Sequence, residues 1–147
     1  MAQHLNSHWW GVKPALSCEG TSVRTTFYIQ RAQENAASSS RPGGNTAQRL
    51  FGVSNTWLNP FGLEDHSFQI KFEQQNSKDS SGYSYLLENG ANRTLQSRRG
   101  TVAWLAPLPL AKTWRWSLAA NSIDQQSNIV FFKQRSFSLE SSIWRVW

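Results

Sequence analysis

The residues that could carry out catalysis or hold a metal ion are few in this sequence. Histidine occurs three times and cysteine once, at His4, His8, His66 and Cys18. Glu64 and Asp65 precede His66, but no second His or Cys stands at ligand spacing, so we interpret this segment as a polar turn. The sequence has no phosphate-binding glycine loop, nucleophile elbow or zinc pattern. We therefore expect a protein that is not an enzyme, with no catalytic residue, no metal and no cofactor.

Aromatic side chains supply a different chemistry, that of binding. The chain has eight Trp, eight Phe and three Tyr among 147 residues. Their flat surfaces suit the apolar faces of sugar rings and of nucleobases. A sugar site also needs a few polar groups that fix the ligand's orientation. We predict ligand binding at the aromatic residues expected to be exposed and at two loop asparagines, namely Trp9, Tyr28, Trp147, Asn45 and Asn92.

Positive charge is the second binding signal. The chain carries 15 Lys and Arg against 9 Asp and Glu, a net charge of +6. Segments 112–115 and 143–147 mix cations with tryptophans, a combination that suits a groove for single-stranded nucleic acid. The same pattern also arises when outward cations simply alternate with inward aromatics. The predicted polyanion-binding residues are Arg98, Arg99, Lys112, Arg115 and Arg145.

Four tryptophans recur at nearly regular intervals. Trp10, Trp57 and Trp104 stand 47 residues apart, and Trp144 follows 40 residues later. After each of the first three, a proline follows within four residues and a leucine after six. This self-similarity predicts one domain over 1–147 built from three units, 10–56, 57–103 and 104–147, with chance spacing as the alternative.

Strand patterns dominate the chain. Segment 23–30 alternates apolar and polar residues, which places Val23, Thr25, Phe27 and Ile29 on one face of a strand. Segments 67–73 and 113–118 show the same alternation, and we expect the apolar sets of all three segments to fill a core. Further strands are predicted at 49–57, 82–87, 95–105, 129–134 and 137–147, and loops at 38–45, 75–82, 88–92 and 120–128.

These features predict an all-β antiparallel fold with a pseudo-three-fold repeat of about 47 residues. A β-trefoil-like fold or a closed meander β-barrel would remove exposed sheet edges, and a three-sheet prism fits the same pattern. Three units that each end near a tryptophan-bearing strand resemble the β-trefoil plan of many lectins. The Gln-x-Trp motif of the ricin-type branch is absent, because Asn55, Val102 and Ser142 stand two residues before the tryptophans.

The leading functional hypothesis is a lectin-like, carbohydrate-binding module without enzymatic activity. One alternative is a structural or assembly protein associated with nucleic acid or another polyanion, and homo-oligomers are left open. A second alternative is a β-barrel that holds a small apolar ligand. The amino terminus lacks the pattern of a secretory signal and no apolar run is long enough for a membrane span, so we expect a cytoplasmic protein.

Overall fold

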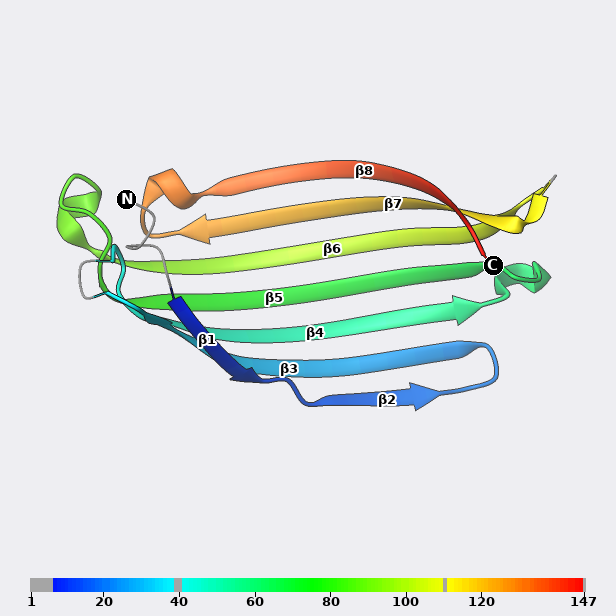
Figure 1. The fold of residues 1–147 in the computed structure, drawn as a ribbon, viewed down its shortest axis with the longest axis horizontal. Coiled ribbons are helices and arrows are strands. Elements are labelled where there is room, and N and C mark those ends of the chain that lie inside the picture. Colours follow the sequence, from blue (N-terminus) through cyan, green and yellow to red (C-terminus); the bar gives the residue numbers. More distant parts are fainter. Residues whose placement is uncertain (1–6, 39–40, 110, 147) are drawn as a thin grey trace.

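The computed structural model describes residues 7–38, 41–109 and 111–146, apart from the side chain of Lys112. Eight β-strands contain most of these residues, and three short 3₁₀ helices lie in the connections between strands (Figure 1). The strands are β1 (Ser7–Val12), β2 (Ala15–Glu19), β3 (Val23–Ala36), β4 (Thr46–Leu58), β5 (Ser67–Gly82), β6 (Asn92–Leu108), β7 (Ala111–Ser127) and β8 (Gln134–Arg145). The helices are η2 (Pro60–Gly62), η3 (Glu88–Gly90) and η4 (Val130–Phe132). Within the described residues, no helix has the length and apolar character needed to cross a membrane.

All eight strands belong to one antiparallel sheet. From β3 to β8 each strand pairs with the next in sequence, while β1 and β2 both pair with the outer edge of β3. Lys13 and Pro14 separate β1 from β2, and a lysine and a proline at an edge discourage pairing with another chain. The edge formed by β1 and β2 does not pair with β8, so the sheet is open.

The predicted all-β antiparallel fold is confirmed, whereas the prediction of a closed sheet, as in a trefoil or a meander barrel, is wrong. We expected closure because it removes exposed edges. This chain instead keeps two edges, one of them interrupted at Pro14. The described strands therefore enclose no lumen for the small apolar ligand considered above.

The strands are longer than their sequence patterns suggest. Segments 75–82 and 120–128, predicted as loops, lie almost entirely in β5 and β7. Segments 82–87 and 129–134, predicted as strands, instead form most of the connections that contain η3 and η4. Pairing with a neighbouring strand outweighs local propensity here, because a half-exposed strand accepts Ser, Asn and Gln. The predicted loop at 88–92 does lie mostly between strands, and its residues Asn89 and Gly90 both have positive φ.

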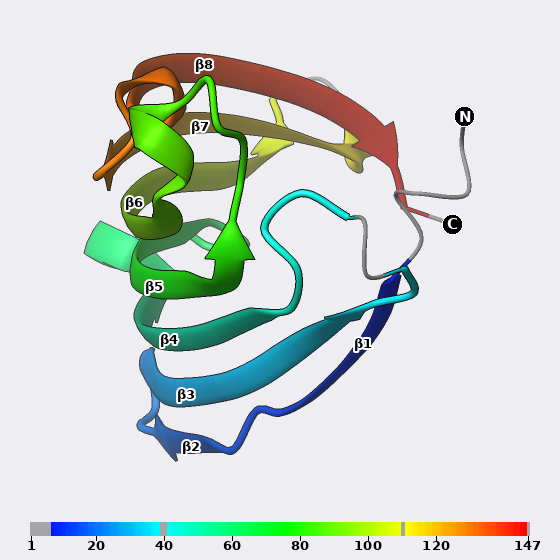
Figure 2. The ribbon, with the colours of Figure 1, turned by 90° about the vertical axis from the view of Figure 1, so that its left-hand side faces the viewer.

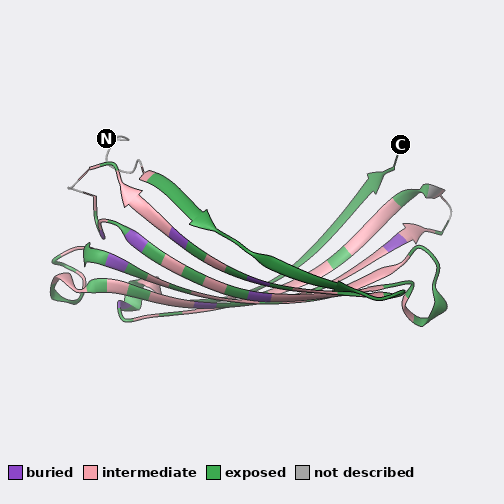
Figure 3. Ribbon diagram, turned by 90° about the horizontal axis from the view of Figure 1, so that it is seen from below, coloured by how far each residue is buried: buried purple, intermediate pink, exposed green. Residues whose placement is uncertain are grey.

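The sheet is bent like the wall of a bowl, which gives it a concave and a convex face. Figures 2 and 3 show that both its edges and its strand ends bend toward the same side. The connection between β3 and β4 curves into the hollow of the sheet (Figure 2), where Gly43 lies against the side chain of Asp79. The side chain of Asp79 therefore belongs to the concave face. Residues that lie opposite each other in the pairing register share a face, so the register assigns each remaining strand position to the concave or the convex face.

Burial is reversed relative to the usual arrangement of an amphipathic sheet. The concave face is mostly polar and holds most of the buried strand positions, including Tyr28, Thr46, Asp79 and Ser97. The convex face is mostly apolar, and much of it is exposed. Figure 3 shows that β2 and most of β8 are exposed along their lengths. The predicted apolar sets of 23–30, 67–73 and 113–118 do share one face, but that face is the uncovered one and not a core.

The four regularly spaced tryptophans do not occupy one structural position. Trp57 and Trp104 lie on the convex face, each directly opposite Phe68 of β5. Trp10 lies on the same face at the other end of β3, and Trp144 lies on the concave face. The three-unit repeat is therefore not confirmed.

Candidate binding face

The convex face carries a large apolar surface, which we call the apolar zone. Its exposed members come from six strands and are Phe27, Ile29, Phe51, Ile70, Phe72, Val102, Leu118, Phe137, Leu139 and Ile143. Polar side chains interrupt the zone at Thr25, Asn55 and Ser122. Monomeric proteins rarely expose contiguous apolar patches larger than a few hundred Å², so a surface of this kind marks an interaction site.

A row of aromatic rings forms the half-buried margin of the apolar zone. The ring centroids of Trp57 and Phe68 are 5.5 Å apart, and those of Phe68 and Trp104 are 5.9 Å apart. The His66 ring packs edge-on against Trp104 at 5.7 Å. Cross-strand aromatic pairs at these distances stabilise a sheet, and they hold this margin rigid.

Positive charge is concentrated on the convex face. Among the paired strand positions, the convex face has one acid, Asp124, against the cations Arg31, Arg49, Lys78, Arg98, Arg135 and Arg145. The concave face is close to neutral, with Arg24, Lys71, Arg93, Arg99 and Arg115 against Glu19, Glu34, Glu73, Asp79 and Glu140. The net positive charge of the paired strand positions therefore lies on the convex face, together with the apolar zone.

Five of the convex cations form a cationic band next to the apolar zone: Arg31, Arg49, Lys78, Arg98 and Arg135. Arg31 and Arg49 are direct partners across β3 and β4, while Arg98 lies opposite Gln74 and Asp124. A groove of about 590 Å³ includes two of these cations, and its lining contains Arg49, Asn76, Lys78, Gln96 and Gln126. Guanidinium, ammonium and amide groups donate hydrogen bonds, so this groove suits an anionic or oxygen-rich ligand.

Hydrogen bonds and ion pairs join polar side chains across the concave face. The Tyr28 hydroxyl donates a hydrogen bond to Oε1 of Glu73 at 2.7 Å, and Nζ of Lys71 lies 3.1 Å from the same carboxylate. The Tyr28 ring is 7% exposed, and a side chain at Gly52 would collide with it. The expectation that Tyr28 is exposed is therefore wrong, because the ring lies against Gly52 and Nζ of Lys13 lies 4.4 Å from its centroid; its role in ligand binding stays a prediction.

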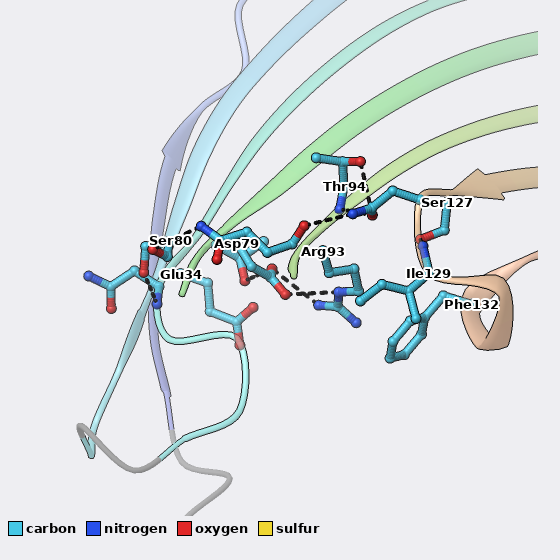
Figure 4. Close-up of polar contacts among 12 residues, drawn as sticks. Glu34, Asp79, Ser80, Arg93, Thr94, Ser127, Ile129 and Phe132 are labelled. Carbon is cyan, nitrogen blue, oxygen red and sulfur yellow. Dashed lines mark hydrogen bonds and ion pairs between the residues drawn. The ribbon is translucent and has the colours of Figure 1, made fainter. Parts of the chain in front are cut away.

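A second polar cluster joins the strand ends (Figure 4). Asp79 of β5 is almost fully buried, and it accepts hydrogen bonds from Oγ1 of Thr46 and Nε of Arg93, each at 2.9 Å. The Arg93 guanidinium also lies 5.0 Å from the Tyr83 ring centroid and 4.7 Å from that of Phe132. This cluster ties the connections after β5 and β7 to the sheet.

These carboxylates make stability depend on pH. Burial opposes ionisation of Glu73, but the hydrogen bonds from Tyr28 and Lys71 outweigh it and hold its pKa below the usual value. The Ser7 hydroxyl and Arg41 likewise lower the pKa of Glu34. Burial and the bond to Glu73 raise the pKa of Tyr28 above that of a free tyrosine. Lowered carboxyl pKa values stabilise the fold above about pH 4.3, and a raised tyrosine pKa stabilises it below about pH 10.

We therefore expect the urea midpoint to be highest near neutral pH, and to fall both below about pH 4.3 and above about pH 10. Tyr28→Phe should lower the free energy of unfolding at pH 7 by roughly 1–3 kcal/mol, because it leaves the Glu73 carboxylate short of a donor, and should weaken the alkaline loss. The control is Tyr85→Phe, at a tyrosine that is 89% exposed. Equal midpoints for the two variants at pH 7 would contradict this account.

The structure places the other predicted ligand-binding residues outside the apolar zone, although Asn45 and Asn92 share a cavity with Lys78 of the cationic band. Trp9 is exposed, as expected, but it lies on the concave side of the β1 edge. Asn45 and Asn92 line one cavity of about 420 Å³ at the end of the sheet. The backbone of Asn45 bonds with Ser80, and Nδ2 of Asn92 donates to the carbonyl of Ser80, so both support the connections. Trp147 lies outside the described residues.

The five predicted polyanion-binding residues divide between the two faces. Arg98 and Arg145 lie on the convex face, and Arg99 and Arg115 on the concave face, where Nη2 of Arg115 is 3.6 Å from Oδ2 of Asp65. The side chain of Lys112 lies outside the described part. Neighbouring residues in a strand point to opposite faces, so Arg98 and Arg99 cannot act together on one ligand.

The residues with catalytic potential do not converge. His66 lies in the turn before β5, with Nδ1 2.8 Å from the backbone oxygen of Glu64, and Cys18 is exposed on the edge strand β2. Among the described residues, no three His, Cys, Asp or Glu side chains are placed to hold a metal ion.

The cations that sequence reasoning missed are Arg31, Arg49, Lys78 and Arg135. They stand far from one another in the sequence, and only the pairing of the six strands from β3 to β8 places them on one face. The comparison with known proteins adds nothing to this assignment, because no protein-family model, no curated protein and no solved structure matches the chain.

Proposed function

We propose that this protein is a non-enzymatic binding module that holds an anionic partner on the convex face of its sheet. The observation that supports this proposal is the distribution of charge. Cations strongly outnumber acids among the paired positions of the convex face, whereas the numbers of cations and acids on the concave face are equal. Concentrated charge of one sign attracts and steers a partner of the opposite sign.

The groove beside Arg49 and Lys78 is the proposed contact site. Its cations come from β4 and β5, and the amides of Asn76, Gln96 and Gln126 extend it across β5, β6 and β7. An extended anion lying across these strands would meet a donor on each of them. The site thus suits a polymer or an array of anions better than a single small ion.

Counterion release tests this proposal. Affinity for dextran sulfate or a single-stranded oligonucleotide should fall linearly with salt on logarithmic axes. The triple variant Arg49→Gln, Lys78→Gln and Arg98→Gln should reduce the slope by about 2 and weaken binding at low salt by more than tenfold. The control makes the same change in net charge on the concave face, through Arg24→Gln, Arg99→Gln and Arg115→Gln. Equal effects of the two triple variants would show that only net charge matters, and would overturn the assignment of the site.

A carbohydrate ligand remains the second candidate, and the amides of the same groove favour it. Asn76, Gln96 and Gln126 can bond to sugar hydroxyls, and Phe51 lines the adjoining cavity of about 420 Å³. A neutral oligosaccharide would bind with little dependence on salt, whereas an acidic one would follow the slope described above. A glycan array read at two salt concentrations separates these cases.

A further inference from the structure

The chain exposes more surface than a compact protein of this size normally does. The chain has an accessible surface of 10342 Å² and a mass of 16.7 kDa. A compact protein of that mass exposes about 7,600 Å², so the excess is about 2,700 Å². This excess is as large as the area buried in permanent protein interfaces. The sheet is a single open layer, and many of its exposed large apolar side chains belong to the apolar zone, which would be covered best by a surface that is itself apolar.

We propose that the convex face docks on an anionic lipid surface. This inference rests on the function proposed above and names the source of the anions, which are lipid headgroups. In this arrangement the apolar zone enters the boundary between headgroups and acyl chains, and the cationic band contacts the headgroups.

The order of side chains along the strands supports this partner. The cationic band follows one side of the apolar zone, and Arg145, opposite Trp114, lies at its other side. A surface that binds at a lipid interface combines an apolar face with flanking cations and with tryptophans near the headgroups. Trp57, Trp104 and Trp114 provide such tryptophans at the margin of the zone.

The curvature of the sheet also suits this orientation. Both edges bend away from the convex side (Figure 2), so the unpaired backbone edges of β2 and β8 turn away from a lipid surface on which the convex face rests, and the part of the apolar zone on β3 to β7 makes the deepest contact. The unpaired backbone groups of the edge strands then stay in water. Such groups are not tolerated in hydrocarbon, where nothing can bond to them. A flat sheet with the same side chains would not meet this condition.

A second copy of the chain is a poorer partner for this face. Two convex surfaces touch over a small area, which leaves most of the apolar zone uncovered. Stacking would also bring two cationic bands of the same sign together, and like charges placed across an interface are unfavourable. An anionic lipid surface is deformable and has the opposite charge, so it avoids both problems.

The first experiment uses the unmodified chain. It is mixed with vesicles of phosphatidylcholine alone or of phosphatidylcholine with phosphatidylglycerol, and binding is followed by flotation and by tryptophan emission. We expect flotation with the anionic vesicles, a blue shift of the emission, and quenching by lipids brominated on their acyl chains. Flotation without quenching would mean that the apolar zone stays outside the acyl region, and would overturn the inference.

Neighbouring residues on opposite faces provide matched variants. Ile70→Asp places a charge in the apolar zone, and it should weaken binding to anionic vesicles roughly tenfold or more, while Gln69→Asp on the concave face should not. Arg98→Gln should weaken it about fivefold, while Arg99→Gln should not. Circular dichroism checks that each variant is folded, and quenching of the unmodified chain tests the inference even if Ile70→Asp does not fold.

Soluble dextran sulfate separates failure of this inference from failure of the proposed function. If Ile70→Asp leaves binding to both dextran sulfate and anionic vesicles unchanged, while Arg98→Gln weakens both, the protein binds anions without inserting into lipid, and the inference is wrong. If Arg98→Gln changes neither, the proposed function is wrong as well. Concentration-dependent dimerisation that Ile70→Asp abolishes, without flotation of the unmodified chain, would identify a second copy as the partner.

Discussion

Replacing Asp79 with alanine should lower the free energy of unfolding by about 3–5 kcal/mol, the cost of breaking a buried ion pair. The Asp79 side chain is 1% exposed, and its partner Arg93 packs against the rings of both Tyr83 and Phe132. The substitution would leave the Arg93 guanidinium partly buried without its carboxylate, and Thr46 without the acceptor of its hydroxyl. We expect this to be the largest stability effect of any single polar substitution considered for this protein.

Urea unfolding followed by circular dichroism measures this change. The matched control is Asp65→Ala, which also removes a carboxylate near an arginine, but Asp65 is 70% exposed and lies 3.6 Å from Arg115. An exposed pair of this kind contributes at most about 1 kcal/mol. A loss for Asp79→Ala no larger than that of the control would show that this cluster does not hold the sheet end together.

Trp104→Ala is expected to have the second largest effect on stability, a loss of about 2–4 kcal/mol. The Trp104 ring contacts Phe68 on one side and His66 on the other, so its removal interrupts the aromatic row that crosses β4, β5 and β6. The expected loss lies below that of a fully buried tryptophan, because solvent reaches part of the ring.

The control for this prediction is Trp10→Ala, on the same face but 55% exposed near the end of the sheet. It should cost less than half as much as Trp104→Ala. Equal losses would mean that contacts within the aromatic row add nothing to the contribution of Trp104, and would contradict this prediction. The anionic-vesicle assay on the two variants separates stability from binding, because both residues lie on the convex face.

The positions of several strands could be predicted from the sequence. The alternation in 23–30 correctly placed Phe27 and Ile29 on one face, because side chains in a strand point to opposite sides in turn. The same rule grouped Phe68, Ile70 and Phe72. The ends of β5 and β7 could not be predicted, since their Ser, Asn and Gln residues are typical of loops and are held in the strands by pairing with neighbours.

The candidate site was only partly predictable. Arg98 was identified from the sequence, but it was grouped with Arg99, which lies on the opposite face. Arg31, Arg49 and Lys78 stand in three different segments without any motif, so no local pattern connects them. Tyr28 was expected to be exposed, because its strand alternates clearly, and alternation does not say which face the fold will cover.

The sequence by itself determined which side chains share a face, because the two-residue period of a strand is a local property of the backbone. Only the tertiary structure decided which face is covered and where the charge gathers. Curvature depends on how all the strands twist and pair together, and it covers the polar face while leaving the apolar zone exposed. Pairing likewise brings Arg31 beside Arg49 from distant parts of the chain, and so turns a net charge of +6 that is dispersed in the sequence into a cationic band.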